Sequence, residues 1–353
     1  MATSQFTIYT SSDPNGPGML LGTAGSLVSV LNACLVNGYT GKPSAGWTKP
    51  IPDISGSMAC YKQASGSQFT LFVNDSGPNA NSLTREAWVC GYETITSLTG
   101  STGGGSIFTG SYGNGTGYGQ FPLSFQNGTY GHVVVRKSSA NDTTNRPWII
   151  AADASTMYMW VLTGDVANSY AHWSFGDIYA LRNTDVYKGY IYAMPTENST
   201  PGGNNDVCDC INMGCQRDQG SNFSGQMAGH FVARNMSGFG GSNWFSRRGD
   251  AGVASSGHDA ACYVTNINGV LPCPNPADNS IWMNPLWMMD YPTIALRGKF
   301  RGLYQICHPI SNFSDGQVFS GSGDFAGRTF MVVKTSPYNS MWGLEISPTV
   351  DTN

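Results

Sequence analysis

The chain has 353 residues, a formal net charge of −4 at pH 7, and only 11% charged residues, where about 25% is typical. It contains no run of Lys or Arg, so it lacks the clustered cations that nucleic-acid binding requires. With 12% aromatic residues and 45 Gly, the composition excludes a disordered chain and favours a β-protein rich in turns.

The N-terminal part is predicted to contain a strand and then the chain's one clear helix. Residues 1–8 show neither the basic nor the apolar region of a signal peptide. Residues 6–11 read as a strand. Apolar residues then recur at i, i+4, i+7 and i+8, which predicts a short helix over 26–36 with Ser26 or Thr23 as its N-cap.

The stretch from Gly46 to Ile95 predicts an antiparallel meander. Three runs rich in β-branched and aromatic residues, at 58–63, 68–77 and 85–93, are separated by clusters of Gly, Ser, Asn and Asp. Polar and apolar residues alternate imperfectly in the middle run. We therefore expect both faces of that strand to be covered.

Further strands are expected along the rest of the chain. A hairpin is predicted from 147–153 and 157–162, and single strands at 132–137, 173–180, 190–194, 294–306, 329–334 and 342–346. The predicted fold class is all-β, with mainly antiparallel sandwich or barrel-like sheets, one short N-terminal helix and long irregular loops. No apolar run approaches the roughly 18 residues of a membrane span.

The composition shifts at Pro195 and suggests a division of the chain. We expect an N-terminal β domain over 1–194 and a Gly-, Asn- and Cys-rich linker or loop over 195–225. A C-terminal β region over 226–353 follows, either separate from the first domain or packed with it as one unit. Within it, residues 271–293 are rich in Pro, Trp and Met and are expected to be ordered but irregular.

The nine cysteines divide into core residues and a loop cluster. Cys34, Cys60 and Cys90 lie in apolar runs and are expected in the core. Three more, Cys208, Cys210 and Cys215, are close in sequence, and His230 or His258 could complete a metal site. Their spacing lacks the paired C-x2-C arrangement of zinc sites, so a metal site, a late-formed disulfide and unpaired thiols remain open. We expect no obligatory metal and no cofactor.

Catalytic motifs are missing from the sequence. It contains no G-x-S-x-G elbow, no H-E-x-x-H and no Walker motif, and its five histidines are scattered. Asp177 and Asp324 follow glycine and are interpreted as turn acids. We assign no catalytic residue and expect no enzyme, although distant carboxylates could still converge, as they do in glycosidases.

The tryptophans are expected to fall into two groups. Four lie in or beside predicted strands and are expected in the core: Trp47, Trp88, Trp148 and Trp160. Three lie in segments expected to be irregular: Trp244, Trp282 and Trp287. These three are candidate contacts to a protein partner or a glycan, with burial as the alternative.

Several motifs resemble a family of tailed-bacteriophage virion structural proteins. The resemblance covers most of the chain but is poor over 195–290. Its motifs are Gly25–Leu27 to Asn37–Tyr39, Gly46–Pro50, Leu71–Gly77, Gly91–Thr94, Val135–Ser139, Arg146–Trp148, Phe175–Asp177, Arg297–Gly298 to Leu303–Tyr304, and Gly323–Phe330.

The resemblance implies a non-enzymatic virion protein that is assembled in the host cytoplasm. Its expected partners are other copies of itself and the major capsid protein or tail proteins. A capsid decoration or stabilising role is preferred. The alternative is a tail or baseplate protein, with binding of a host glycan or receptor through loop aromatics as one role. A cell-envelope hydrolase is a third class.

Overall fold

The computed structural model describes residues 6–77, 84–99, 116–121, 132–164, 170–193, 229–234, 238, 245–246, 261–262, 274–277, 279–290, 295–335 and 340–346. The chain is an all-β protein, as the sequence predicts. Among the described residues, no helix is both long enough and apolar enough to cross a membrane.

The larger sheet has 13 strands and is antiparallel throughout its described pairings. Its main path runs β1-β8-β9-β10-β16-β19-β18-β17. Those strands are Thr7–Thr10, Trp148–Ala152, Thr156–Val161, Ala171–Ala180, Ala295–Ile306, Ser340–Glu345, Thr329–Thr335 and Val318–Ser320. The strands β11 (Gly189–Ala193), β12 (Gly229–Val232) and β13 (Phe245–Ser246) branch from β10, while β14 (Ala261–Cys262) and β15 (Met283–Asp290) branch from β16.

A second sheet confirms the predicted meander. It has the order β2-β3-β4-β7, with strands Met58–Lys62, Thr70–Asn74, Glu86–Tyr92 and Val133–Arg136. The strands β5 (Thr94–Ser97) and β6 (Thr116–Tyr118) form a separate pair. Every residue of β3 is buried, as expected for a strand covered on both faces.

The main core lies between these two sheets. Leu71 and Val73 of β3 and Met157 and Met159 of β9 belong to one buried apolar cluster, which the helix also joins. Phe72 points the other way, into a smaller cluster on the outer face of the four-stranded sheet. Burial on both faces explains why these strands have nearly continuous apolar runs.

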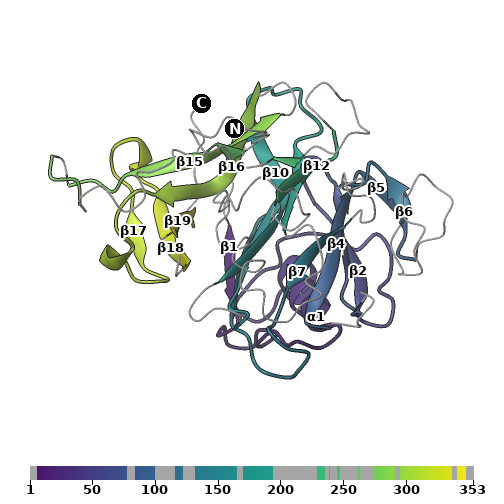
Figure 1. Cartoon of the computed structure of the whole chain (residues 1–353). Coiled ribbons are helices and arrows are strands. Elements are labelled where there is room, and N and C mark those ends of the chain that lie inside the picture. Colours follow the sequence, from purple (N-terminus) through teal and green to yellow (C-terminus); the bar gives the residue numbers. More distant parts are fainter. Residues whose placement is uncertain are drawn as a thin grey trace, which may run out of the picture.

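The larger sheet also curls onto its own second face. Tyr158 and Trp160 of β9 share a second cluster with Phe300 of β16 and Trp342 of β19. Figure 1 shows the resulting arrangement, with β17–β19 on the opposite side of β1 from the four-stranded sheet. The central strands β8 to β11 therefore lie between two apolar layers.

Two residues mark where the curled sheet changes direction. In β10, Gly176 pairs with β9 and β11 and Asp177 pairs with β11, whereas the residues from Ile178 on pair with β16. In β16, Gly302 has φ 58° and separates the segment that pairs with β10 from the segment that pairs with β19. A Cβ on Gly302 would lie 2.6 Å from the ring of Phe6, so glycine permits this close packing.

The helix is where the sequence places it, but its N-cap prediction was wrong. An α-helical part, α1 (Ser26–Leu31), continues as a π-helical part, η1 (Asn32–Asn37). Gly25 is the N-cap, and neither Ser26 nor Thr23 caps the helix with its side chain. Instead, the N–H of Leu27 donates to Oδ2 of Asp75 at 2.8 Å, so the second sheet supplies the cap.

Residues 271–293 were expected to be irregular, and the structure corrects this for their C-terminal part, which forms β15. Pro285 cannot donate to a strand ladder, yet it is accommodated because the register with β16 shifts between Pro285 and Trp287. The proposed linker, 195–225, lies outside the described residues. Because β10 pairs with β16, strands from both sides of it share one sheet.

Candidate functional site

The structure distinguishes the three tryptophans proposed as contact residues. Trp244 lies outside the described residues. Trp282 directly precedes β15 and is 49% exposed, which makes it the only tryptophan among the exposed large apolar side chains of the described residues. Trp287 is half-buried within β15, so the expectation that it lies in an irregular segment was wrong.

The backbone of Trp282 is held firmly while its side chain is exposed. Its N–H donates to Nε2 of His308 at 2.7 Å, and its carbonyl accepts from the N–H of Cys307 at 3.0 Å. His308 is fully buried. Figure 1 shows that the segment leading into β15 extends away from the body of the molecule. Trp282 is therefore an exposed aromatic residue with a fixed backbone, a suitable anchor for a partner.

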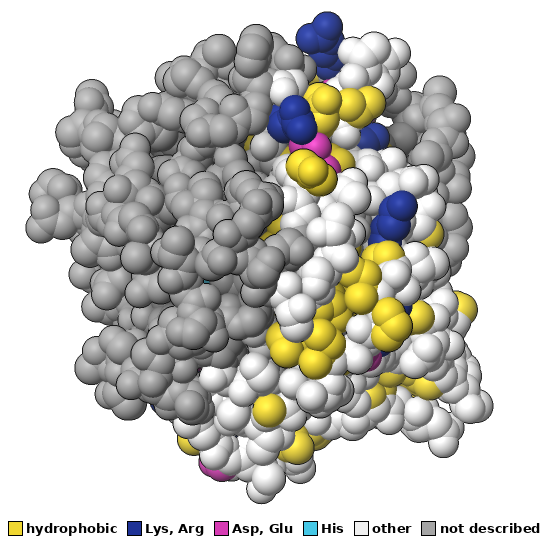
Figure 2. All heavy atoms as spheres, turned by 90° about the vertical axis from the view of Figure 1, so that its right-hand side faces the viewer, with side chains coloured by type: hydrophobic (Ala, Val, Ile, Leu, Met, Phe, Trp, Pro, Cys, Tyr) yellow, Lys and Arg dark blue, Asp and Glu magenta, His cyan; other side chains and the backbone are white. Residues whose placement is uncertain are grey.

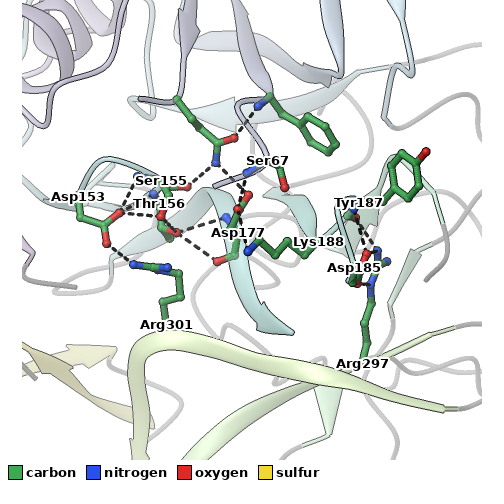
Figure 3. Close-up of polar contacts among 12 residues, drawn as sticks. Ser67, Asp153, Ser155, Thr156, Asp177, Asp185, Tyr187, Lys188, Arg297 and Arg301 are labelled. Atoms are coloured by element: carbon green, nitrogen blue, oxygen red, sulfur yellow. Dashed lines mark hydrogen bonds and ion pairs between the residues drawn. The ribbon is translucent and has the colours of Figure 1, made fainter. Parts of the chain in front are cut away.

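Asp177 was predicted to be a turn acid, and the structure corrects this. It lies inside β10 and is fully buried. Its carboxylate accepts from the N–H of Ser67 at 2.7 Å and from Nε2 of Gln63 at 3.2 Å, and Nζ of Lys188 lies 4.0 Å away (Figure 3). Burial raises the pKa of Asp177. The carboxylate thus joins the loop before β3 to the larger sheet.

Two arginines of β16 reach further carboxylates from the same side of that strand (Figure 3). Nη2 of Arg301 donates to Asp153 at 2.8 Å, and Asp153 also accepts from the N–H groups of Ser155 and Thr156 in the β8–β9 turn. Arg297 forms a bidentate pair with Asp185, at 2.8 and 3.1 Å. These contacts tie β16 to the turns at the ends of other strands.

A buried ion pair connects the helix with the second sheet. Nζ of Lys137 donates to Oδ1 of Asp75, and both side chains are fully buried. The same ammonium donates to the carbonyl of Thr23 at 2.7 Å and to Oγ of Ser26 at 3.3 Å. Asp75 therefore caps the helix with one oxygen and binds Lys137 with the other.

This ion pair gives a pH dependence that can be measured. Burial raises the pKa of Asp75 to about 6, although Lys137 and the helix N–H groups favour its charged form. Between pH 7.5 and 4.5 the folded protein takes up this proton before the unfolded chain does, so the contribution of Asp75 to stability grows as the pH falls. We expect the difference in unfolding free energy between wild type and Asp75→Asn to widen by about 1–2 kcal/mol at pH 4.5. Denaturant titrations at both pH values measure it, and a narrower difference at pH 4.5 would contradict the assignment.

Several of the sequence motifs named above contact one another in the structure. The Asp75–Lys137 pair joins the motif Leu71–Gly77 to the motif Val135–Ser139, and Lys137 also contacts Ser26. Arg146 donates to the hydroxyls of Ser138 and Ser139 at 3.0 and 2.7 Å. The rings of Trp47 and Phe175 pack edge to face, with centroids 5.8 Å apart.

The C-terminal motifs form a similar joint. The guanidinium of Arg328 lies over the rings of Phe325, Phe330 and Tyr304, and its Nε donates to Glu345 at 2.8 Å. Cation–π and charge-assisted contacts of this kind fix an arginine in one geometry. The side chains of these motifs thus hold distant segments together.

The histidine and cysteine side chains that the structure describes occupy packed positions. His132 stacks on Trp88, with centroids 3.8 Å apart, and burial lowers its pKa to about 3. Cys34, Cys60 and Cys90 are buried free thiols, as predicted. The cluster Cys208, Cys210 and Cys215 lies outside the described residues, as does His258. Within the described part of the chain, no three His, Cys, Asp or Glu side chains are grouped as a metal site would require.

Sequence reasoning missed the buried charges. A usable signal was present, because Lys137 directly follows a buried strand and Arg297 lies within another, β16, in a chain with few charges. In the part of the face that Figure 2 draws in colour, charged side chains are few among uncharged ones. Searches against protein-family models and curated proteins found no match.

Proposed function

We propose that the chain is a non-enzymatic structural protein of a tailed-bacteriophage particle, with a capsid decoration or stabilising role preferred over a tail or baseplate role. The observation that carries the proposal is the resemblance of its motifs to virion proteins. The structure adds support because the side chains of these motifs serve as joints between distant segments. Asp75 with Lys137, and Arg328 with Glu345, are the main examples.

The character of the surface also supports assembly into fixed contacts. A surface with few ions can be buried without the desolvation cost of many charges. Trp282 supplies an exposed aromatic anchor, with its backbone held by His308 and Cys307. In a symmetric assembly, such a contact would recur between neighbouring copies of this chain. The alternative is that each copy makes the contact with the major capsid protein or with a tail protein.

The proposal predicts that the chain copurifies with intact particles. Mass spectrometry of gradient-purified particles, followed by electron cryo-microscopy, should find it in many copies on the head, burying at least about 800 Å² per partner. A location on the tail would favour the alternative role. Absence from intact particles, with the purified protein monomeric, would refute the proposal.

Trp282 provides a sharper test of the contact surface. Losing an aromatic anchor typically costs 2 kcal/mol or more of binding energy, so we expect Trp282→Ser to reduce incorporation into particles at least about 10-fold. Tyr118→Ser is the matched control, because Tyr118 is 72% exposed and lies on β6, in a different sheet. Equal incorporation of the two variants would show that Trp282 is not an anchor.

A further inference from the structure

The two ends of the larger sheet differ in how their outer edges are covered. Along the main path of this sheet, β1 and β17 are the terminal strands. In β1 the carbonyl of Ile8 accepts from Nζ of Lys42 at 2.6 Å, and the N–H of Thr10 donates to Oδ2 of Asp13 at 2.9 Å. Charged side chains placed along an edge hinder its pairing with another strand. The edge of β1 is therefore blocked by the chain itself.

The outer edge of β17 is open. The N–H of Gly321 donates to the carbonyl of Arg328 at 2.8 Å, in register with the pairing of β17 and β18. Backbone groups of successive residues point to opposite sides of an antiparallel strand, so Val318 and Ser320 direct their N–H and C=O groups away from β18. No residue that the structure describes bonds to these outward groups. They are left for another strand.

The side chains along this edge are exposed to solvent. Val318 is 55% exposed, and Ser320 and residues 314–317 are exposed as well. Figure 1 shows β17 at the outer side of the C-terminal strands. Val318 lies opposite Met331, and Met331 lies opposite Leu344, which is buried in the second apolar cluster. Opposite residues share a face, so an added strand would extend this apolar row beyond Val318.

The charged residues that flank β17 are both acidic. Asp315 precedes the strand, Asp324 follows it, and both are exposed. The flanking segments 311–317 and 321–327 contain no Lys or Arg. On β18, the ammonium of Lys334 donates to the carbonyl of Phe313 at 2.8 Å. Two copies of β17 paired antiparallel would bring the Asp315 end of one beside the Asp324 end of the other, and like charges disfavour that pairing.

We propose that the edge of β17 binds an extended segment of a different protein, with a lysine or arginine at each end and an apolar residue opposite Val318. When a strand is added to an open edge, main-chain hydrogen bonds supply affinity and side chains supply specificity. The row that ends at Val318 selects the apolar residue, while Asp315 and Asp324 select the cations. A sugar or a nucleic acid has no ladder of N–H and C=O groups to match this edge. The site goes beyond the proposed structural role and is separate from Trp282.

The test uses the purified full chain and the fluorescence anisotropy of labelled peptides. The probe is the capped heptapeptide Lys-Thr-Val-Ser-Val-Thr-Lys. One control is the same peptide N-methylated at both valines, and the other has glutamate at both ends. We expect the probe to bind at least about 10-fold more tightly than either control, and more weakly in 0.5 M NaCl. Failure of the probe to bind at millimolar concentration, or equal binding of the methylated peptide, would overturn the proposal. Equal binding of the glutamate peptide would overturn the charge selection.

Substitutions in β17 assign the binding to its edge. Val318→Pro removes an outward N–H but no hydrogen bond to β18, so it should weaken probe binding at least about 10-fold. Val318→Thr is the matched control, because it keeps both the N–H and a β-branched side chain, and it should bind the probe as wild type does. Asp324→Asn should weaken binding and reduce its salt dependence. Unchanged binding by folded Val318→Pro would overturn the assignment to β17.

Two further points keep the test decisive. The methylated peptide is compared on the wild-type chain, so its result stands even if Val318→Pro fails to fold. Sedimentation of the chain alone tests the other occupant, because a dimer that Val318→Pro dissociates would show that a second copy fills the edge. These results are independent of whether the chain is found in particles.

Discussion

Replacing Lys137 with methionine is expected to lower the free energy of unfolding by about 3–5 kcal/mol, because it leaves the carboxylate of Asp75 buried without its cation. Both side chains of the pair are fully buried. The substitution also removes the donor to the carbonyl of Thr23, which precedes the helix. Denaturant unfolding followed by tryptophan fluorescence would measure the loss.

The chain offers a matched control for this pair. Lys49 and Asp53 form a lysine–aspartate pair whose side chains are 22% and 21% exposed. Solvent screens such a pair, so Lys49→Met should cost at most about 1 kcal/mol. Similar costs for the two lysine variants would mean that the buried pair does not stabilise the junction of helix and sheet. A double variant, Asp75→Leu with Lys137→Met, should recover part of the loss because no charge stays buried.

Replacing Arg297 with methionine is expected to have an effect of similar size, about 3–5 kcal/mol. Arg297 is buried, binds both oxygens of Asp185, and donates to the carbonyls of Tyr187 and Arg234. Its loss would leave Asp185 buried and unpaired, and would release the β10–β11 turn from β16. Limited proteolysis should then cut this turn faster, alongside the loss seen in denaturant titrations.

Two further variants separate geometry from charge. Arg297→Lys keeps the charge but cannot reproduce the bidentate fork, so it should restore only part of the stability. Arg234→Met is the matched control, since Arg234 also forms a bidentate pair, with Glu93, but its side chain is 34% exposed. We expect that control to cost about 1 kcal/mol. A loss for Arg297→Met no larger than this would contradict the role given to Arg297.

The sequence by itself determined where most of the described strands and the helix lie. The segments that form β2, β3 and β4 are rich in β-branched and aromatic residues and are bounded by turn residues. These residue preferences depend on the local sequence and not on which strand is the neighbour. The helix followed from apolar residues at one-face spacing. The burial of both faces of β3 followed from its nearly continuous apolar run.

Only the tertiary structure decided which segments meet. Asp75 caps a helix 48 residues away, and Arg297 binds an aspartate 112 residues away. Asp177 looked like a turn acid because it follows a glycine, yet it lies in a buried strand. Trp287 was expected in an irregular segment because residues 271–293 are rich in Pro, Trp and Met, yet a register shift accommodates Pro285 within β15. Local preferences cannot settle these points, because strand partners and buried ion pairs form only when distant segments are brought together and water is excluded.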